Sequence, residues 1–129
     1  MIVLDANVLI ALLDRDDVHH ELADSLFRAH LDEPKAVSVL TMAEFLVRPT
    51  KHGTAEAAIQ DAAAIEVEVL PLPAGDAAAL AETRARSGLK MPDAIVLHTA
   101  QRTHASVMTF DQDLARAAHL MGLTTLGQS

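Results

Sequence analysis

The chain opens with a short apolar run, Ile2–Leu4, that ends in the acidic residue Asp5. A continuous apolar run without polar alternation is typical of a strand buried on both faces. Directly after it, residues 8–13 repeat valine and leucine at helical spacing. A buried strand that passes straight into a helix predicts a parallel sheet covered by helices, because parallel strands need crossover connections.

The same alternation continues to the end of the chain. Hydrophobic spacing and stop signals predict helices over 22–31, 41–48, 55–65 and 76–86, with two more beginning at 92–93 and 111–113. Strands are expected at 67–70, 106–110 and 124–126, and residues 37–40 are a short strand or a lead-in. Pro49 is expected to end its helix near residue 47 or 48. We therefore predict one three-layer α/β domain over residues 1–129, with a mainly parallel central sheet flanked by helices.

Composition excludes several classes of protein. With 129 residues, 50% of them hydrophobic, the chain can bury a real core, and disorder is excluded. Its longest apolar run, residues 8–13, falls far short of the roughly 20 residues that span a bilayer. Cysteine is absent, and the first residues lack the basic and apolar regions of a signal peptide. We expect a cytoplasmic protein with no membrane contact.

The charge of the chain limits how it can handle nucleic acid. Ten basic against eighteen acidic residues give a net charge of −8, which argues against binding through bulk electrostatics. Three phenylalanines, with no tryptophan or tyrosine, are too few for a base-stacking platform. The five glycines are dispersed, so no phosphate-binding P-loop exists. If this protein handles RNA, something must offset its negative charge locally, and a divalent cation is the obvious candidate.

Carboxylates follow the predicted strands. Asp5 and Asp111 each close a strand, Asp93 opens a helix, and Glu44 lies inside another helix. Groups just beyond the carboxyl ends of parallel strands face a shared crevice, so these acids, with Asp113, can converge there. Converging carboxylates repel one another unless a cation lies between them, and oxygen ligands suit Mg²⁺ or Mn²⁺. A divalent cation lowers the pKa of a bound water and stabilises charge on a phosphoryl oxygen.

Each of these polar residues also has a purely structural interpretation. Asp5, Asn7, Asp93 and Asp111 are residue types that cap helices. Thr41–Glu44 fits a capping box, in which Glu44 reaches back to a backbone N–H. Spacing alone leaves the capping and metal-binding interpretations evenly balanced.

Two other kinds of site are less well supported. The segment Asp5–Asn7 after a strand is similar to the motif of phosphatases that form an aspartyl phosphate. In those enzymes the second residue after the nucleophilic aspartate should be acidic, whereas here it is Asn7. His19 and His20 lack the spacing of a helical metal pair and indicate a solvated loop.

Five segments, in order along nearly the whole chain, resemble the motifs of PIN-domain nucleases, particularly VapC-type toxins of bacterial toxin–antitoxin pairs. They are Ile2–Leu9, Asp17–Glu21, Thr41–Phe45, Pro92–Ile95 and Thr109–Leu114. His98, Gln101 and Leu114 depart from the residues common in relatives, at positions that bear on packing more than on the acids.

This resemblance implies a metal-dependent endoribonuclease. Asp5, Glu44, Asp93 and Asp111 would be its catalytic acids and would hold Mg²⁺ or Mn²⁺, with Asp5 and Asp93 as the most direct ligands. Asp113 would be an auxiliary ligand or a helix cap.

The resemblance also implies an RNA substrate, a cognate antitoxin protein and a homodimer. Asn7 would position water or substrate. Lys90 and Arg102 are the candidate phosphate contacts, whereas Arg84 and Arg86 are better explained by a helix C-terminus. The alternative is a non-catalytic PIN-like binding module whose acidic pocket receives a basic partner tail.

Overall fold

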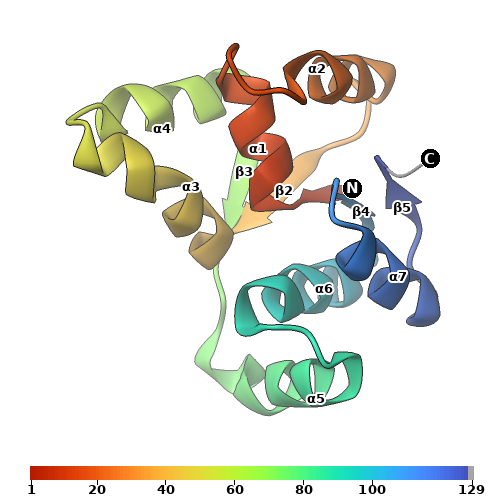
Figure 1. Ribbon diagram of the computed structural model, residues 1–129. Helices are drawn as coiled ribbons and strands as arrows, with labels where there is room; N and C mark the ends of the chain where they lie inside the picture. Colours follow the sequence, from red (N-terminus) through yellow and green to blue (C-terminus); the bar gives the residue numbers. More distant parts are fainter. Residues whose placement is uncertain (128–129) are drawn as a thin grey trace.

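The computed structural model describes residues 1–127 and contains one parallel five-stranded sheet (Figure 1). Its strands are β1 (Ile2–Leu4), β2 (Lys35–Ser38), β3 (Val67–Leu70), β4 (Ser106–Met108) and β5 (Thr125–Leu126). They lie in the order β3-β2-β1-β4-β5, and each neighbouring pair is parallel. β1 and β2 are buried throughout. The apolar run of β1 predicts this, whereas β2 begins with Lys35 and ends with Ser38, which are both buried.

Helices cover both faces of this sheet. They are α1 (Ala6–Leu13), α2 (His20–Ala29), α3 (Val39–Lys51), α4 (Ala55–Ala64), α5 (Ala77–Ser87), α6 (Met91–Thr103) and α7 (Gln112–Leu120), with a 3₁₀ turn at Ala74–Asp76 before α5. In Figure 1, α1 to α4 lie on one side of the sheet and α5 to α7 on the other. The prediction of a three-layer α/β fold is confirmed.

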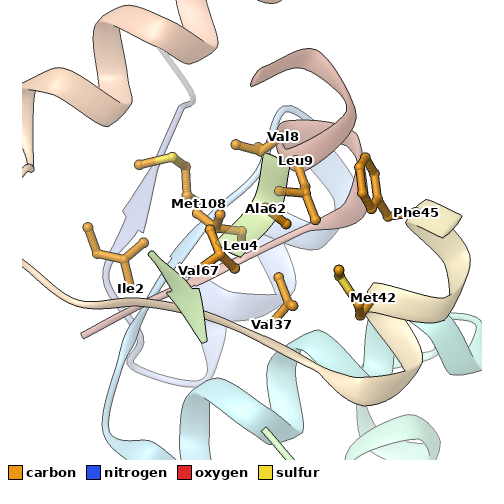
Figure 2. Close-up of a cluster of buried hydrophobic side chains, with 10 residues drawn as sticks. All are labelled: Ile2, Leu4, Val8, Leu9, Val37, Met42, Phe45, Ala62, Val67 and Met108. Carbon is orange, nitrogen blue, oxygen red and sulfur yellow. The ribbon is translucent and has the colours of Figure 1, made fainter. Parts of the chain in front are cut away.

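Each face of the sheet has its own hydrophobic core. On one face, residues of β1, β2, β3 and β4 pack against α1, α3 and α4; Figure 2 shows this cluster, which includes Leu4, Leu9, Val37, Phe45 and Met108. On the other face, residues of β1 and β4 pack against α6 and α7. Because β1 contributes to both cores, the residue that follows it is held firmly in place.

Several predicted boundaries were wrong. The strand expected at 37–40 is β2 at Lys35–Ser38, and the helix expected at 22–31 is α2 at His20–Ala29. α3 begins at Val39 rather than at Thr41, and it continues through Pro49 to Lys51. Pro49 lies in the last turn, where its missing N–H removes only one helical hydrogen bond, and its carbonyl accepts from Thr54 N at 2.8 Å. β4 is shorter than expected and ends at Met108, so Thr109 and Phe110 lie in the connection to α7.

The predicted single domain covers residues 1–129, of which 128 and 129 lie outside the described residues. Among the helices that the structure describes, none is long and apolar enough to cross a membrane.

Candidate active site

The site begins where β1 and β4 end side by side. Leu4 pairs with Met108 in the parallel register, so Asp5 and Thr109 are neighbours at the carboxyl edge of the sheet. Asp5 is buried, and its Oδ2 accepts a hydrogen bond from Thr109 Oγ1 at 2.7 Å. Its Oδ1 accepts from the backbone N–H of Ala6 at 2.8 Å, which begins α1. In the sheet, β2 lies on one side of β1 and β4 on the other, so the strand order reverses between β1 and β4. Open α/β sheets bind ligands at such a switch point.

The β4–α7 connection supplies Asp111 and Asp113. Asp111 is the N-cap of α7, and its Oδ1 accepts from Leu114 N at 3.0 Å. Its own N–H donates to Thr109 Oγ1 at 3.0 Å, so Thr109 links Asp5 to the backbone of Asp111. Asp113 is exposed in the first turn of α7 and lies 3.4 Å from Arg116. The capping interpretation therefore holds for Asp5 and Asp111, but it does not remove either residue from the site.

α3 supplies Glu44 from its second turn. The N-cap of α3 is Ser38, whose Oγ accepts from Thr41 N at 3.1 Å. The alternative interpretation of Thr41–Glu44 as a capping box is therefore wrong, because the N-cap is Ser38 and Glu44 lies beyond reach of the start of α3. Within residues 1–127 the Glu44 side chain makes no hydrogen bond or ion pair.

Asp93 lies in the first turn of α6. Lys90 occupies the N-cap position of that helix, with no side-chain capping bond. Asp93 therefore does not cap α6, and in the described part of the chain its carboxylate has neither a hydrogen-bond partner nor an ion-pair partner. The positive end of the helix dipole favours a negative charge at this position.

The pKa values show that these carboxylates share one electrostatic neighbourhood. Burial raises the pKa of Asp5, and the charges of Asp93 and Asp111 raise it further, against the lowering effect of the hydrogen bonds from Thr109 and Ala6. Partial loss of hydration raises the pKa of Glu44, with smaller contributions from Asp5 and Asp93. The structure thus brings carboxylates from four different elements into mutual repulsion.

Asp93 shows the same pattern. Its pKa is raised by partial burial first and then by Asp111 and Asp113, while the nearby Lys90 lowers it. We call Asp5, Glu44, Asp93, Asp111 and Asp113 the acidic cluster. Among the described residues, Lys90 is the cation that lowers the pKa of Asp93.

The chemistry of the acidic cluster fits a divalent cation. Its donors are all carboxylate oxygens, two of its members are unpaired, and their repulsion is relieved by a positive ion. Across residues 1–127, no group of three or more His, Asp or Glu side chains is close enough to hold a metal ion as the side chains stand. An ion that keeps several of its waters, as Mg²⁺ does, suits such an open set of ligands.

The three predicted substrate contacts lie at different places. Asn7 faces the β4–α7 connection, where its Oδ1 accepts from Phe110 N at 3.5 Å. Lys90 is exposed beside Asp93. Arg102 lies in the last turn of α6, nine residues from Asp93 and so roughly 13 Å along the helix. It donates to the carbonyl of Pro71 at 3.0 Å and lies 3.5 Å from Asp76.

His98, one of the three residues that depart from those common in relatives, has a structural role in this protein. His98 is buried on α6, and its Nε2 lies 3.0 Å from Asp76 Oδ2, beside Arg102. This contact ties the segment before α5 to α6, at a distance from the acidic cluster.

Sequence reasoning missed Thr109 and Gly127. Thr109 is fully buried and holds Asp5 in place. The signal available was a hydroxyl residue near the end of a predicted strand and two residues before an acid. Gly127 has a φ of +99°, and a Cβ there would lie 2.5 Å from the carbonyl oxygen of Thr109. Only glycine fits this close approach without a backbone shift. No pattern within the sequence indicated that contact.

Fold and site together define a three-layer α/β protein with an acidic cluster at the switch point of its sheet. A family model described as PIN domain matches residues 2–120. The chain belongs to the PIN domain family. No curated protein sequence matches the chain.

Solved structures share this fold. A toxin–antitoxin complex from Klebsiella pneumoniae matches with a TM-score of 0.75 and 24% identity, covering 89% of this chain and 91% of that chain. Mycobacterium tuberculosis VapC20, a sarcin–ricin loop cleaving toxin, matches with a TM-score of 0.76 and 20% identity over 91% of this chain and 95% of its own. VapBC2 from Rickettsia felis, bound to a fragment of its promoter DNA, matches with a TM-score of 0.74 and 17% identity over 98% of both chains.

Proposed function

We propose that this protein is a metal-dependent endoribonuclease and the toxin of a toxin–antitoxin pair. The observation that carries the proposal is the acidic cluster, in which Glu44 and Asp93 have no partner within residues 1–127 and burial and repulsion raise the pKa values of Asp5, Glu44 and Asp93. Membership of the PIN domain family supports it, as does the shared fold with a toxin that cleaves the sarcin–ricin loop.

Each member of the acidic cluster has a role in this proposal. Asp5 and Asp93 would hold Mg²⁺ or Mn²⁺ directly, with Glu44 and Asp111 completing the site and Asp113 as an auxiliary ligand. Such a cation, when bound, supplies an activated water and stabilises charge on a phosphoryl oxygen. Thr109 and Ala6 fix the orientation of the Asp5 carboxylate.

The substrate contacts follow from position. Lys90, exposed beside Asp93, offers its ammonium group to a phosphate, and Asn7 orients water or substrate at the β4–α7 connection. Arg102 reaches a phosphate only if it leaves Asp76, so Lys90 is the favoured contact. Attack by water leaves a 5′-phosphate and a 3′-hydroxyl.

The decisive experiment is digestion of total cellular RNA with Mn²⁺, with mapping of new 5′ ends. We expect discrete 5′-phosphate ends with the wild type and none with Asp93→Asn. Asp32→Asn, which changes an exposed aspartate outside the acidic cluster, should cut as the wild type does. Ends bearing a 2′,3′-cyclic phosphate would contradict the mechanism.

The proposed partners are a cognate antitoxin and a second copy of the chain. A groove of about 430 Å³ lies between α1, α3 and α4, with Ile10 and Phe45 in its wall. Its lining holds three acidic residues against one arginine: Asp14, Glu44 and Asp61, with Arg48. An antitoxin with an apolar helix and a basic tail complements both its apolar surface and its charge. The similarity to a toxin–antitoxin complex from Klebsiella pneumoniae supports an antitoxin partner.

The second candidate is a PIN-like binding module whose acidic cluster only receives a basic tail. The separation of Arg102 from the cluster favours it, since few cations remain to hold RNA. An enzyme loses cleavage in Asp93→Asn while partner binding largely persists. A binding module shows no cleavage under any metal.

A further inference from the structure

Two aromatic rings stack at the edge of the acidic cluster. His19, at the N-cap position of α2, lies against Phe110 in the β4–α7 connection, with ring centroids 5.1 Å apart and an interplanar angle of 23°. The His19 side chain is 53% exposed. Because Phe110 covers one face of the imidazole, that exposure belongs to the opposite face and the ring edge.

Both rings are held in place. Phe110 packs against the larger core cluster, and its backbone N–H donates to Asn7 Oδ1. The backbone N–H of His19 donates to Asp17 Oδ1 at 2.8 Å, and its Nδ1 lies 3.8 Å from the same oxygen. A flat ring whose outer face is open and whose inner face rests on a packed phenylalanine is preorganised for stacking.

The His19–Phe110 pair lies next to the acidic cluster in the fold. Phe110 lies between Thr109, which donates to Asp5, and Asp111, which caps α7. The backbone of Phe110 therefore lies beside the acidic cluster, and a base attached to a phosphate bound there would be within reach of the ring pair. Unpaired RNA bases are recognised by splaying them onto rings of this kind, histidine included.

We propose that the outer face of His19, supported by Phe110, is a stacking subsite for one unpaired RNA base next to the scissile phosphate. The proposal rests on the proposed ribonuclease function and adds to it a determinant of base preference. It also revises the expectation that the chain has too few rings for stacking, since one histidine completes a platform that the phenylalanines alone do not form. Purines, with their larger π-surface, should be preferred.

In the alternative interpretation, the His19–Phe110 pair has only a structural role and anchors the α1–α2 connection. To separate the two, a pool of random-sequence RNA is digested with Mn²⁺ by the wild type, His19→Ala, His19→Phe and His119→Ala. We expect a purine preference at one position beside the cut in the wild type and in His19→Phe, which keeps a flat ring. His119→Ala, which removes an exposed histidine near the end of α7, should behave as the wild type does.

In His19→Ala we expect the preference to disappear and KM to rise about tenfold with kcat little changed, because one stacked base is lost from binding. An unchanged KM and base profile in His19→Ala would overturn the subsite, whereas RNA left uncut by the wild type would overturn the ribonuclease function instead.

A direct binding measurement tests the stacking subsite independently of RNA cleavage. Single-stranded RNA carrying 2-aminopurine is titrated into Asp93→Asn and into Asp93→Asn/His19→Ala, and its fluorescence is followed because stacking quenches it. Stronger quenching in the variant that retains His19 supports the subsite. Equal fluorescence in the two, quenched or not, overturns it.

Discussion

At the scale of single residues, Thr109 connects the two halves of the site. Its buried hydroxyl donates to Asp5 and accepts from the N–H of Asp111, so one side chain fixes the carboxylate that follows β1 relative to the start of α7. Loss of hydration raises the pKa of Asp5, and the hydrogen bond from Thr109 lowers it. Asp5 therefore depends on Thr109 both for its position and for its charge.

Replacing Thr109 with valine tests this dependence. Thr109→Val keeps the shape but leaves Asp5 Oδ2 and the N–H of Asp111 without this partner, which should destabilise the fold by about 1–3 kcal/mol. Removing the hydrogen bond should also raise the pKa of Asp5 further and lower cleavage. Chemical denaturation and the RNA digestion assay measure the two effects. Thr109→Ser, which keeps the hydroxyl, should lose much less of both, and equal losses in the two variants would show that the methyl group matters instead.

A second prediction concerns how the stability of the metal-free protein, kept in EDTA, depends on pH. Because the folded-state pKa of Asp93 is raised, the native state holds that proton more tightly than the unfolded chain does, so the free energy of unfolding falls as pH rises from about 3.8 through the raised pKa. The destabilisation is fully present above that window and absent below it.

Asp93→Asn removes the charge, so its Tm at pH 7 should exceed that of the wild type, by on the order of 2 °C. The difference should shrink to nothing as pH falls below about 4. Thermal unfolding followed across this pH range measures it. A variant less stable than the wild type at pH 7 would mean that the attraction of the helix dipole for Asp93 outweighs the repulsion within the acidic cluster.

At the scale of elements, α3 shows how a cap decides the placement of a functional residue. Ser38 ends β2 and caps α3 at once, so the turn between strand and helix is short and Glu44 is carried to the carboxyl edge of the sheet. Ser38 is buried, and its hydroxyl also contacts Thr41 Oγ1 at 3.2 Å.

Ser38→Ala should therefore destabilise the protein by about 1 kcal/mol, since the cap to Thr41 N is lost. The matched control is Ser25→Ala, in the middle of α2 and exposed, where alanine favours the helix and the stability should be equal or slightly higher. Urea denaturation of the two variants measures the difference. Equal stabilities would show that α3 needs no cap at Ser38.

At the scale of the whole molecule, the net charge and the acidic cluster together make the protein depend on a cation. A net charge of −8 repels RNA, and the repulsion within the acidic cluster opposes folding. A ligand that binds only the native state raises its stability.

Mn²⁺ at ten times its dissociation constant should therefore raise the Tm of the wild type by about 5 °C, as the added binding free energy of about 1.4 kcal/mol predicts. Asp93→Asn, which removes a proposed ligand, should show much less of this increase, while Asp32→Asn should show all of it. Differential scanning fluorimetry with and without the metal measures the effect. A similar increase in all three proteins would place the metal outside the acidic cluster.

Much of this fold was predictable from sequence because its signals are local. The buried run of β1, the helical spacing after it and the helix expected over 76–86 each depend on neighbours a few residues away. The structure has all three to within one or two residues. The acids at strand ends were predictable for the same reason, since the carboxyl ends of parallel strands share one edge.

What the sequence left open, the tertiary structure decided. Whether Glu44 is a cap or a free carboxylate depends on where α3 begins, and that is set by Ser38 at the end of a paired strand. The Thr109–Asp5 hydrogen bond joins residues 104 positions apart, and the His19–Phe110 stack joins two separate connections. Sequence spacing carries no information about such pairs, because only the register of β1 against β4 and the packing of helices on the sheet bring them together.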